Sequence, residues 1–172
     1  MEGFLNPTEI LKRVNLREDM LAADFGSGSG GWVIPLAKIL RAGKVWAIDV
    51  QEEMLSALKG KAETEKLFNI EISRKNLEQG SGLRENSLDL IIISNLLFQT
   101  TQKKDIIVDA KNSLKPGGQL LIVDWKSDTR FGPKEERISA DDVKEIAKGA
   151  GLQPEKEFEA SNYHWGLIFK KI

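Results

Sequence analysis

Thiol and imidazole groups are almost absent from this sequence. The 172-residue chain contains no cysteine and one histidine, His164. Without a thiol, the chain has no thiolate nucleophile, no disulfide and no cysteine-bound zinc or iron–sulfur centre. One histidine cannot form a histidine-rich metal centre. We therefore expect no metal site.

An excess of charge of either sign and a long apolar run are also missing. Lysine and arginine number 25 against 26 acidic residues, so we do not expect nucleic-acid binding, which needs a basic surface. The longest apolar stretch, residues 88–98, is interrupted by Asp89, Ser94 and Asn95, which argues against a membrane span. The first residues do not resemble a signal peptide. These features predict a cytoplasmic protein and leave its oligomeric state open.

Apolar strand-like runs alternate with helix-period segments along the chain. Because parallel neighbours need crossover connections, this alternation predicts an α/β doubly wound sheet. Two further runs are separated by hairpin spacing and add strands that cannot both be parallel. The expected strands are 20–25, 44–49, 69–73, 87–93, 119–124, 153–159 and 163–170, and the main intervening helices are 32–40, 51–66, about 101–114 and 139–149.

The length fits one domain, 1–172, with little room for a second. Asn6, Pro7 and Glu9 form a helix-start signal, so we expect an N-terminal helix within residues 1–18 as a candidate lid. Residues 115–118 (KPGG) are expected to stop the preceding helix and turn the chain.

A glycine-rich loop, residues 24–31 (DFGSGSGG), follows the first sheet strand. Glycines allow positive φ and close backbone approach, and the next helix directs free N–H groups at a ligand. The spacing also fits the dinucleotide fingerprint. Asp24, however, would repel a pyrophosphate and attract an ammonium group. Asp49, at the end of the second strand, could accept hydrogen bonds from a ribose or cap the following helix.

At these residues the sequence resembles the class I S-adenosylmethionine-dependent methyltransferases. Residues 24–30 are similar to the family's first motif, and residues 94–98 (SNLLF) to the motif after its fourth strand. Residues 114–118 (LKPGG) are similar to the run before its fifth strand. The resemblance implies a Rossmann-like seven-stranded sheet in the order 3-2-1-4-5-7-6, with the seventh strand antiparallel.

The same resemblance implies S-adenosyl-L-methionine as cofactor and a set of binding residues. Loop geometry alone is the competing explanation for Asn76. The implied contacts are Asp24, Gly26, Ser27, Gly28 and Gly30 for the methionine part, Asp49 for the ribose, Val50, Met54, Asn76 and Leu77 for the adenine, and Ser94 beside the methyl donor.

A sulfonium donor is already activated, so alignment of the acceptor can supply much of the rate. If a proton must leave, His164 and Asp124 are the candidate catalytic bases. His164 could equally be a structural histidine, and Asp124 a loop anchor. Gln99 could orient a substrate or be solvated. Aromatic residues, namely Phe4, Phe98, Trp125 and Phe131, would line an acceptor pocket or pack in the core.

The acceptor is expected to be a small molecule. Cytosine-C5 and arsenite methylation use cysteine, which this chain lacks, and residues 94–97 do not match the adenine-N6 signature. What remains resembles the small-molecule branch that includes quinone-ring methyltransferases. We expect direct in-line methyl transfer to an O, N or C nucleophile. The alternatives are a non-catalytic S-adenosylmethionine-binding module and an NAD-linked oxidoreductase.

Overall fold

The structure is a computed structural model that describes residues 3–134 and 136–172. A seven-stranded sheet forms its centre, in the order β3-β2-β1-β4-β5-β7-β6. The pairs among β1 to β5 are parallel, and β7 is antiparallel to both of its neighbours. This confirms the expected topology. The strands are β1 (Leu21–Phe25), β2 (Lys44–Asp49), β3 (Ile70–Arg74), β4 (Leu88–Ser94), β5 (Leu114–Trp125), β6 (Leu152–Glu159) and β7 (His164–Lys171).

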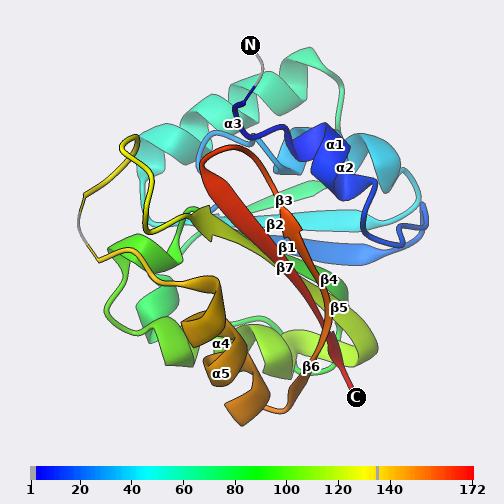
Figure 1. The fold of residues 1–172 in the computed structure, drawn as a ribbon. Helices are drawn as coiled ribbons and strands as arrows, with labels where there is room; N and C mark the ends of the chain where they lie inside the picture. Colours follow the sequence, from blue (N-terminus) through cyan, green and yellow to red (C-terminus); the bar gives the residue numbers. More distant parts are fainter. Residues whose placement is uncertain (1–2, 135) are drawn as a thin grey trace.

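The helices cover both faces of the sheet (Figure 1). The first three lie on one face, and the last two lie on the other. Among the described residues, none of the helices combines the length and apolar character needed to cross a membrane. The helices are α1 (Pro7–Leu11), α2 (Val33–Ile39), α3 (Glu52–Thr64), α4 (Lys103–Ser113) and α5 (Ala140–Gly149), with short 3-10 turns η1 (Leu77–Gln79) and η2 (Leu97–Gln99).

The N-terminal helix is much shorter than the segment in which it was expected. Asn6 is its N-cap and accepts a hydrogen bond from the Glu9 backbone at 3.3 Å, as the start signal predicts. The helix already ends at Leu11. Its buried residues, Ile10 and Leu11, lie on a single turn, and Leu5 and Val14 on either side of the helix join the same apolar layer.

Residues 115–118 were expected to separate α4 from a strand that begins at residue 119. In the structure they lie inside β5, which begins at Leu114. Leu114 pairs with Leu88, and regular pairing resumes where Gln119 meets Leu90, so the KPGG run bulges opposite one residue of β4. Gly117 has a φ of +81°, which lets the backbone fold out and return to the strand. The stop signal therefore ends α4 at Ser113, and the turn lies inside β5.

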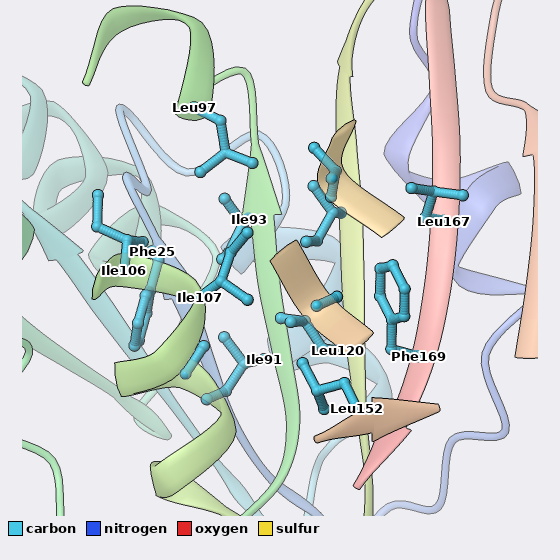
Figure 2. Close-up of a cluster of buried hydrophobic side chains, with 14 of the residues drawn as sticks. Phe25, Ile91, Ile93, Leu97, Ile106, Ile107, Leu120, Leu152, Leu167 and Phe169 are labelled. Atoms are coloured by element: carbon cyan, nitrogen blue, oxygen red, sulfur yellow. The ribbon is translucent and has the colours of Figure 1, made fainter. Parts of the chain in front are cut away.

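Two apolar layers pack on the opposite faces of the sheet. Side chains alternate along each strand, so Phe25 joins the layer beneath α4 and α5, while Asp24 faces the layer under α1, α2 and α3. Figure 2 shows the first layer, where Ile107 of α4 lies beside Ile91 and Ile93 of β4, and side chains of β5 and β7, among them Phe169, continue the layer. This packing fixes the carboxyl edge of the sheet, from which the site is built.

Truncation of a core aromatic residue should be costly. Phe169 is fully buried, so Phe169→Ala should lower the free energy of unfolding by about 3–5 kcal/mol. Phe68 is 90% exposed, and Phe68→Ala should change it by less than about 0.5 kcal/mol. Urea unfolding of the two variants measures the difference, and equal effects would contradict the packing described here.

Candidate active site

A pocket of about 260 Å³ opens at the carboxyl ends of the parallel strands. Its walls come from the loops that follow β1, β2, β3 and β4, where ligands collect in open α/β sheets. Five of the implied cofactor contacts line it. The lining residues are Gly26, Asp49, Val50, Gln51, Lys75, Asn76, Leu77, Glu78, Leu96, Gln99 and Thr100.

The glycine loop is bonded to the end of the neighbouring strand β2. The backbone N–H groups of Gly26 and Ser27 both donate to the Ile48 carbonyl, at 2.8 and 3.0 Å. The N–H of Gly28 donates to Oδ2 of Asp49 at 2.8 Å. Gly26 and Gly28 have φ values of +78° and +51°, which favour glycine. The loop is thereby held open toward the pocket.

Gly30 and Met54, two of the implied cofactor contacts, do not line the pocket. A Cβ on Gly30 would lie 2.4 Å from Cδ1 of Leu58, so this glycine lets α3 pack against the loop. Met54 is 40% exposed and does not line the pocket, although Val50, which is also exposed, does. Ser27 is buried, and its backbone carries the bond to β2.

Asp49 accepts a hydrogen bond on each carboxylate oxygen. Its Oδ1 receives the Gln51 N–H at 2.9 Å, and its Oδ2 receives the N–H of Gly28. Gln51, not Asp49, is the N-cap of α3. Each carboxylate oxygen can accept more than one hydrogen bond, so acceptor sites remain toward the pocket that Asp49 lines.

Asp24 is a buried carboxylate without a compensating contact. It is 1% exposed, and neither oxygen has a hydrogen-bond partner in the described part of the chain. Burial, and then the negative charge of Asp49, raise the pKa of Asp24 to about 8. An isolated buried anion is expensive, so the arrangement suits a cationic ligand that would restore the charge.

Asn76 and Leu77 begin the short turn after β3. The Asn76 side chain accepts the Glu78 backbone N–H at 3.0 Å and is the N-cap of η1. Leu77 is buried at the pocket wall. Asn76 therefore has the loop-building contact that sequence reasoning weighed against a ligand role, and it also lines the pocket.

Unpartnered polar atoms gather at the carboxyl edge of the sheet. Ser94 Oγ and Asn95 Oδ1 are buried at the end of β4 without hydrogen-bond partners among the described residues. Asn95 has a φ of +51°, an uncommon conformation for a residue with a side chain. With the oxygens of Asp24 and Nε2 of His164, they are the buried side-chain atoms that the described residues leave unsatisfied. Such atoms in a native fold indicate a missing polar partner.

Asp124 is engaged by the backbone around it. Its Oδ2 accepts the Leu97 N–H at 3.1 Å, and its Oδ1 accepts the Trp125 N–H at 2.8 Å. Burial raises the pKa of Asp124 to about 6, and these hydrogen bonds oppose that rise. It does not line the pocket. This geometry matches the loop-anchor interpretation, because the carboxylate fixes the start of η2.

His164 stacks on Trp125 with ring centroids 4.1 Å apart. Its Nδ1 lies 2.8 Å from the Ser161 hydroxyl, and Nε2 has no partner in the described ranges. Burial, with the positive charges of Lys126 and Arg137, lowers the pKa of His164 to about 4. The ring is therefore neutral at pH 7.

Three aromatic rings meet beside His164, from segments far apart in the sequence. Tyr163 lies 5.8 Å from Phe4 and 5.0 Å from Phe131, measured between ring centroids. Phe4 and Phe131 are both more than half exposed. We call Phe4, Phe131 and Tyr163 the aromatic surface. It lies where two of the four expected aromatic residues converge, while Trp125 packs on His164.

The loop that displays Phe131 is pinned by one side chain. The Arg137 guanidinium donates to the carbonyls of Pro133, Lys126, Thr129 and Phe131, at 2.6 to 2.8 Å. Four backbone carbonyls on one guanidinium fix the course of residues 126–133.

The described residues include no group of three or more metal-ligating side chains.

Several pocket residues carried no recognisable sequence signal. Sequence reasoning did not select Gln51, Lys75, Glu78 or Thr100, which all line the pocket. Each is a polar residue in a loop or turn, and nothing in its local pattern distinguishes it from solvated surface. The one signal that could have identified them is their position next to residues of the family motifs, such as Asp49 and Asn76.

The fold and the site agree with a match to known proteins. Residues 22–118, more than half of the chain, match the model of the methyltransferase domain family. The chain therefore belongs to that family, and its class is that of the class I S-adenosylmethionine-dependent methyltransferases. S-adenosylmethionine is the cofactor of this class.

Individual relatives narrow the comparison. The chain is 30% identical to a SAM-dependent methyltransferase from Aquifex aeolicus, covering 98% of this chain and 90% of that one, with a TM-score of 0.89. It is 27% identical over 125 residues to the demethylmenaquinone methyltransferase of Oceanobacillus iheyensis, which is 72% of this chain and 52% of that protein. The chain thus spans about half the length of the curated relatives it matches.

A more distant structure shares the fold alone. Phosphoethanolamine N-methyltransferase 2 of Haemonchus contortus, in complex with phosphomonomethylethanolamine and S-adenosylhomocysteine, is 16% identical. The match covers 96% of this chain and 52% of that one, with a TM-score of 0.81.

The charge state of Asp24 makes a prediction about stability. Its pKa of about 8 in the folded protein exceeds its ordinary value of 3.8. The folded state therefore holds this proton more tightly, and the free energy of unfolding falls as pH rises from about 4 to about 8. Asp24→Asn removes this dependence, so the variant should gain on the wild type by up to about 1.4 kcal/mol per pH unit.

Urea unfolding of the ligand-free proteins between pH 5 and pH 8 measures this difference. Because both proteins share every other titrating group, subtraction isolates the contribution of Asp24. A constant difference across that range would mean that Asp24 is ionised throughout.

Proposed function

We propose that the chain binds S-adenosyl-L-methionine in the pocket and catalyses methyl transfer to a small-molecule acceptor. The observation that carries the proposal is the buried, unpartnered Asp24 carboxylate at the end of β1, two residues before Gly26, which lines the pocket. That carboxylate fits an ammonium group and would disfavour a pyrophosphate. The family membership supports the same cofactor over NAD.

Different residues are proposed to bind the different chemical parts of the cofactor. Asp24, with the backbone of Gly26, Ser27, Gly28 and Gly30, is proposed to hold the amino-acid part. The free acceptor sites of Asp49 suit a ribose diol, because each hydroxyl can donate to a carboxylate. Val50, Met54, Asn76 and Leu77 are proposed to enclose the adenine, and Ser94 to border the methyl group.

Methyl transfer requires little further chemistry from the protein. S-adenosylmethionine, when bound, supplies a methyl group on a positively charged sulfur, and its transfer leaves a neutral sulfur and releases a proton from the acceptor. We propose an in-line attack in which the protein supplies alignment. Neither of the two candidate bases lines the pocket. His164 is the more available one for the proton, because Nε2 is unpartnered among the described residues. Asp124 remains a weaker candidate, with both oxygens already bonded.

We propose a quinone-type ring as the acceptor. The name of the Oceanobacillus relative supports this class. The aromatic surface also supports it, because exposed rings stack on planar apolar molecules. It lies toward β5 and β7, next in the sheet order to the strands that form the pocket. The hydroxyl or ring carbon of the reduced form would be the nucleophile. A cytoplasmic location remains a prediction from the composition.

Binding distinguishes this proposal from the NAD alternative. S-adenosylhomocysteine at 100 times its Kd should add about 2.7 kcal/mol to the stability, whereas NAD should add nothing. Asp24→Asn should weaken the binding, because an amide cannot ionise to face the amino group. The measurement is thermal unfolding of ligand-free protein. Stabilisation by NAD and not by S-adenosylhomocysteine would overturn the proposal.

Turnover tests the acceptor and separates an enzyme from a binding module. Labelled methyl groups should pass from the donor to a two-ring hydroquinone. Phe131→Ala should raise the KM for this acceptor by about 2- to 10-fold, the equivalent of one aromatic contact. Phe68→Ala, which truncates an exposed phenylalanine away from the pocket and the aromatic surface, is the matched control. Binding without transfer to any small molecule would favour the non-catalytic module.

A further inference from the structure

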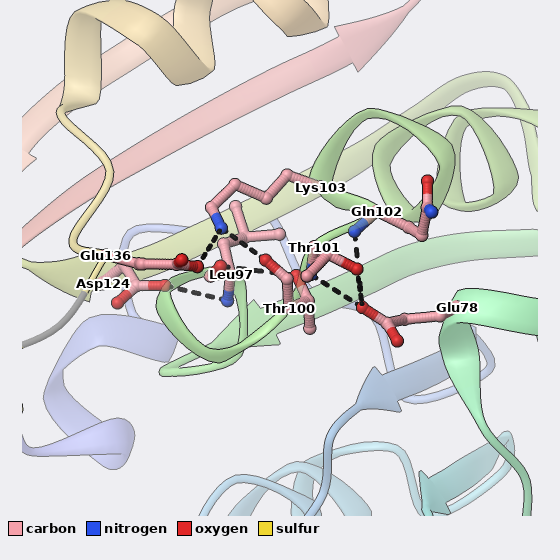
Figure 3. A network of polar contacts seen from close by, with 8 residues as sticks. All are labelled: Glu78, Leu97, Thr100, Thr101, Gln102, Lys103, Asp124 and Glu136. Atoms are coloured by element: carbon pink, nitrogen blue, oxygen red, sulfur yellow. Dashed lines mark hydrogen bonds and ion pairs between the residues drawn. The ribbon is translucent and has the colours of Figure 1, made fainter.

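One carboxylate oxygen joins the two opposite walls of the pocket. Oε1 of Glu78, on η1, accepts the Thr101 N–H at 2.7 Å, the Thr101 hydroxyl at 3.0 Å and the Gln102 N–H at 3.3 Å. Figure 3 shows these contacts at the entrance to α4. We call them the Glu78 hydrogen bonds. They connect the turn after β3 to the segment after β4.

Both connected segments line the pocket. Asn76, Leu77 and Glu78 contribute one wall, and Leu96, Gln99 and Thr100 contribute the facing wall. The second wall is a loop segment, residues 95–102, that has little regular structure beyond η2. Its position therefore depends on the contacts at its two ends.

The first end of this segment is already fixed from the opposite side. Asp124 accepts the Leu97 N–H at this first end. Nearer the far end, the side chain of Lys103, whose Nζ lies 4.0 Å from Oε2 of Glu136, donates to the Thr100 carbonyl. These contacts hold the segment toward β5. The Glu78 hydrogen bonds hold its far end toward β3, so the segment is held between the two sides of the sheet (Figure 3).

The hydrogen bonds to Glu78 are charge-assisted and lie at a helix start. Gln102 is the N-cap of α4, an 11-residue helix whose N-terminus favours a negative charge. The backbone hydrogen bond from Thr101 is the main cause that lowers the pKa of Glu78. The carboxylate is thus ionised near neutral pH.

We propose that Glu78 is a positioning residue: its carboxylate holds residues 100–102 against η1 and so keeps the two walls of the pocket at the separation that binds the cofactor. The proposal rests on the proposed function for the identity of the ligand. Glu78 acts here through Thr101 and Gln102 and not through contact with the cofactor.

The side-chain chemistry provides a sharp set of variants. Because the three donors share one oxygen, the single carbonyl oxygen of Glu78→Gln can still accept them, whereas Glu78→Ala removes them all. Asp109→Ala is a matched control, since Asp109 accepts the Ser81 N–H at 2.8 Å and also joins α4 to the loop after η1. Neither Ser81 nor Asp109 lines the pocket.

The first measurement needs no ligand. Amide hydrogen exchange at Thr101 and Gln102, followed by NMR, should be slow in the wild type and in Glu78→Gln and fast in Glu78→Ala. The Asp109→Ala variant should leave these two amides protected. Unchanged protection in Glu78→Ala would overturn the proposal.

The second measurement is the affinity for S-adenosylhomocysteine, by calorimetry. If loss of the link leaves only a tenth to a fifth of the molecules with a closed pocket, Kd should rise about 5- to 10-fold in Glu78→Ala. Glu78→Gln and Asp109→Ala should stay within about 2-fold of the wild type. In turnover, Glu78→Ala should raise the KM for the donor and leave kcat nearly unchanged.

The outcomes separate two kinds of failure. A Glu78→Gln variant that binds as poorly as Glu78→Ala would show that Glu78 contacts the ligand directly, and would overturn the positioning role. Failure of the wild type to bind S-adenosylhomocysteine would contradict the proposed function, while the exchange rates would still decide whether Glu78 holds the segment.

Discussion

The bonds between the glycine loop and the end of β2 are the constraint on which the site depends. Gly28 donates to Asp49, and the two preceding N–H groups share the Ile48 carbonyl. Asp24, on the strand that leads into this loop, is 1% exposed. The loop also brings the backbone of Gly26 against Leu96, the first residue of the facing wall. These three hydrogen bonds thus fix the loop that contributes Gly26 to the pocket.

The alternation of apolar runs and helical segments was enough to predict the sheet, and resemblance supplied its order. Patterns failed where a signal has two structural uses. The Pro-Gly-Gly run at 116–118 ends a helix as read, but it also forms a bulge, because Leu114 pairs with β4 before the chain turns out. At the N-terminus, Asn6 marks where a helix starts but carries no information on how soon it ends.

Some residues of the site could be identified from the sequence, and others could not. Asp24 could be found because a carboxylate just before a glycine run needs an explanation, and Asp49 because it ends the second strand. Glu78 could not, since its partners lie more than 20 residues away and a single glutamate in a loop gives no local signal. Asp124 shows the converse: sequence placed it at the correct edge, and only its two backbone donors indicate an anchor. The sequence therefore predicted where these carboxylates lie in the sheet, but not which groups donate hydrogen bonds to them.

The guanidinium of Arg137 fixes the backbone of residues 126–133 independently of the side chains that this segment carries. Among the described residues, its hydrogen bonds go to main-chain carbonyls, so the identity of the side chain at 131 does not alter them. Related chains could therefore exchange Phe131 for another side chain on an unchanged scaffold. Under the proposed function, in which the acceptor stacks on the aromatic surface, substrate preference can diverge by single substitutions, without insertions or a new loop.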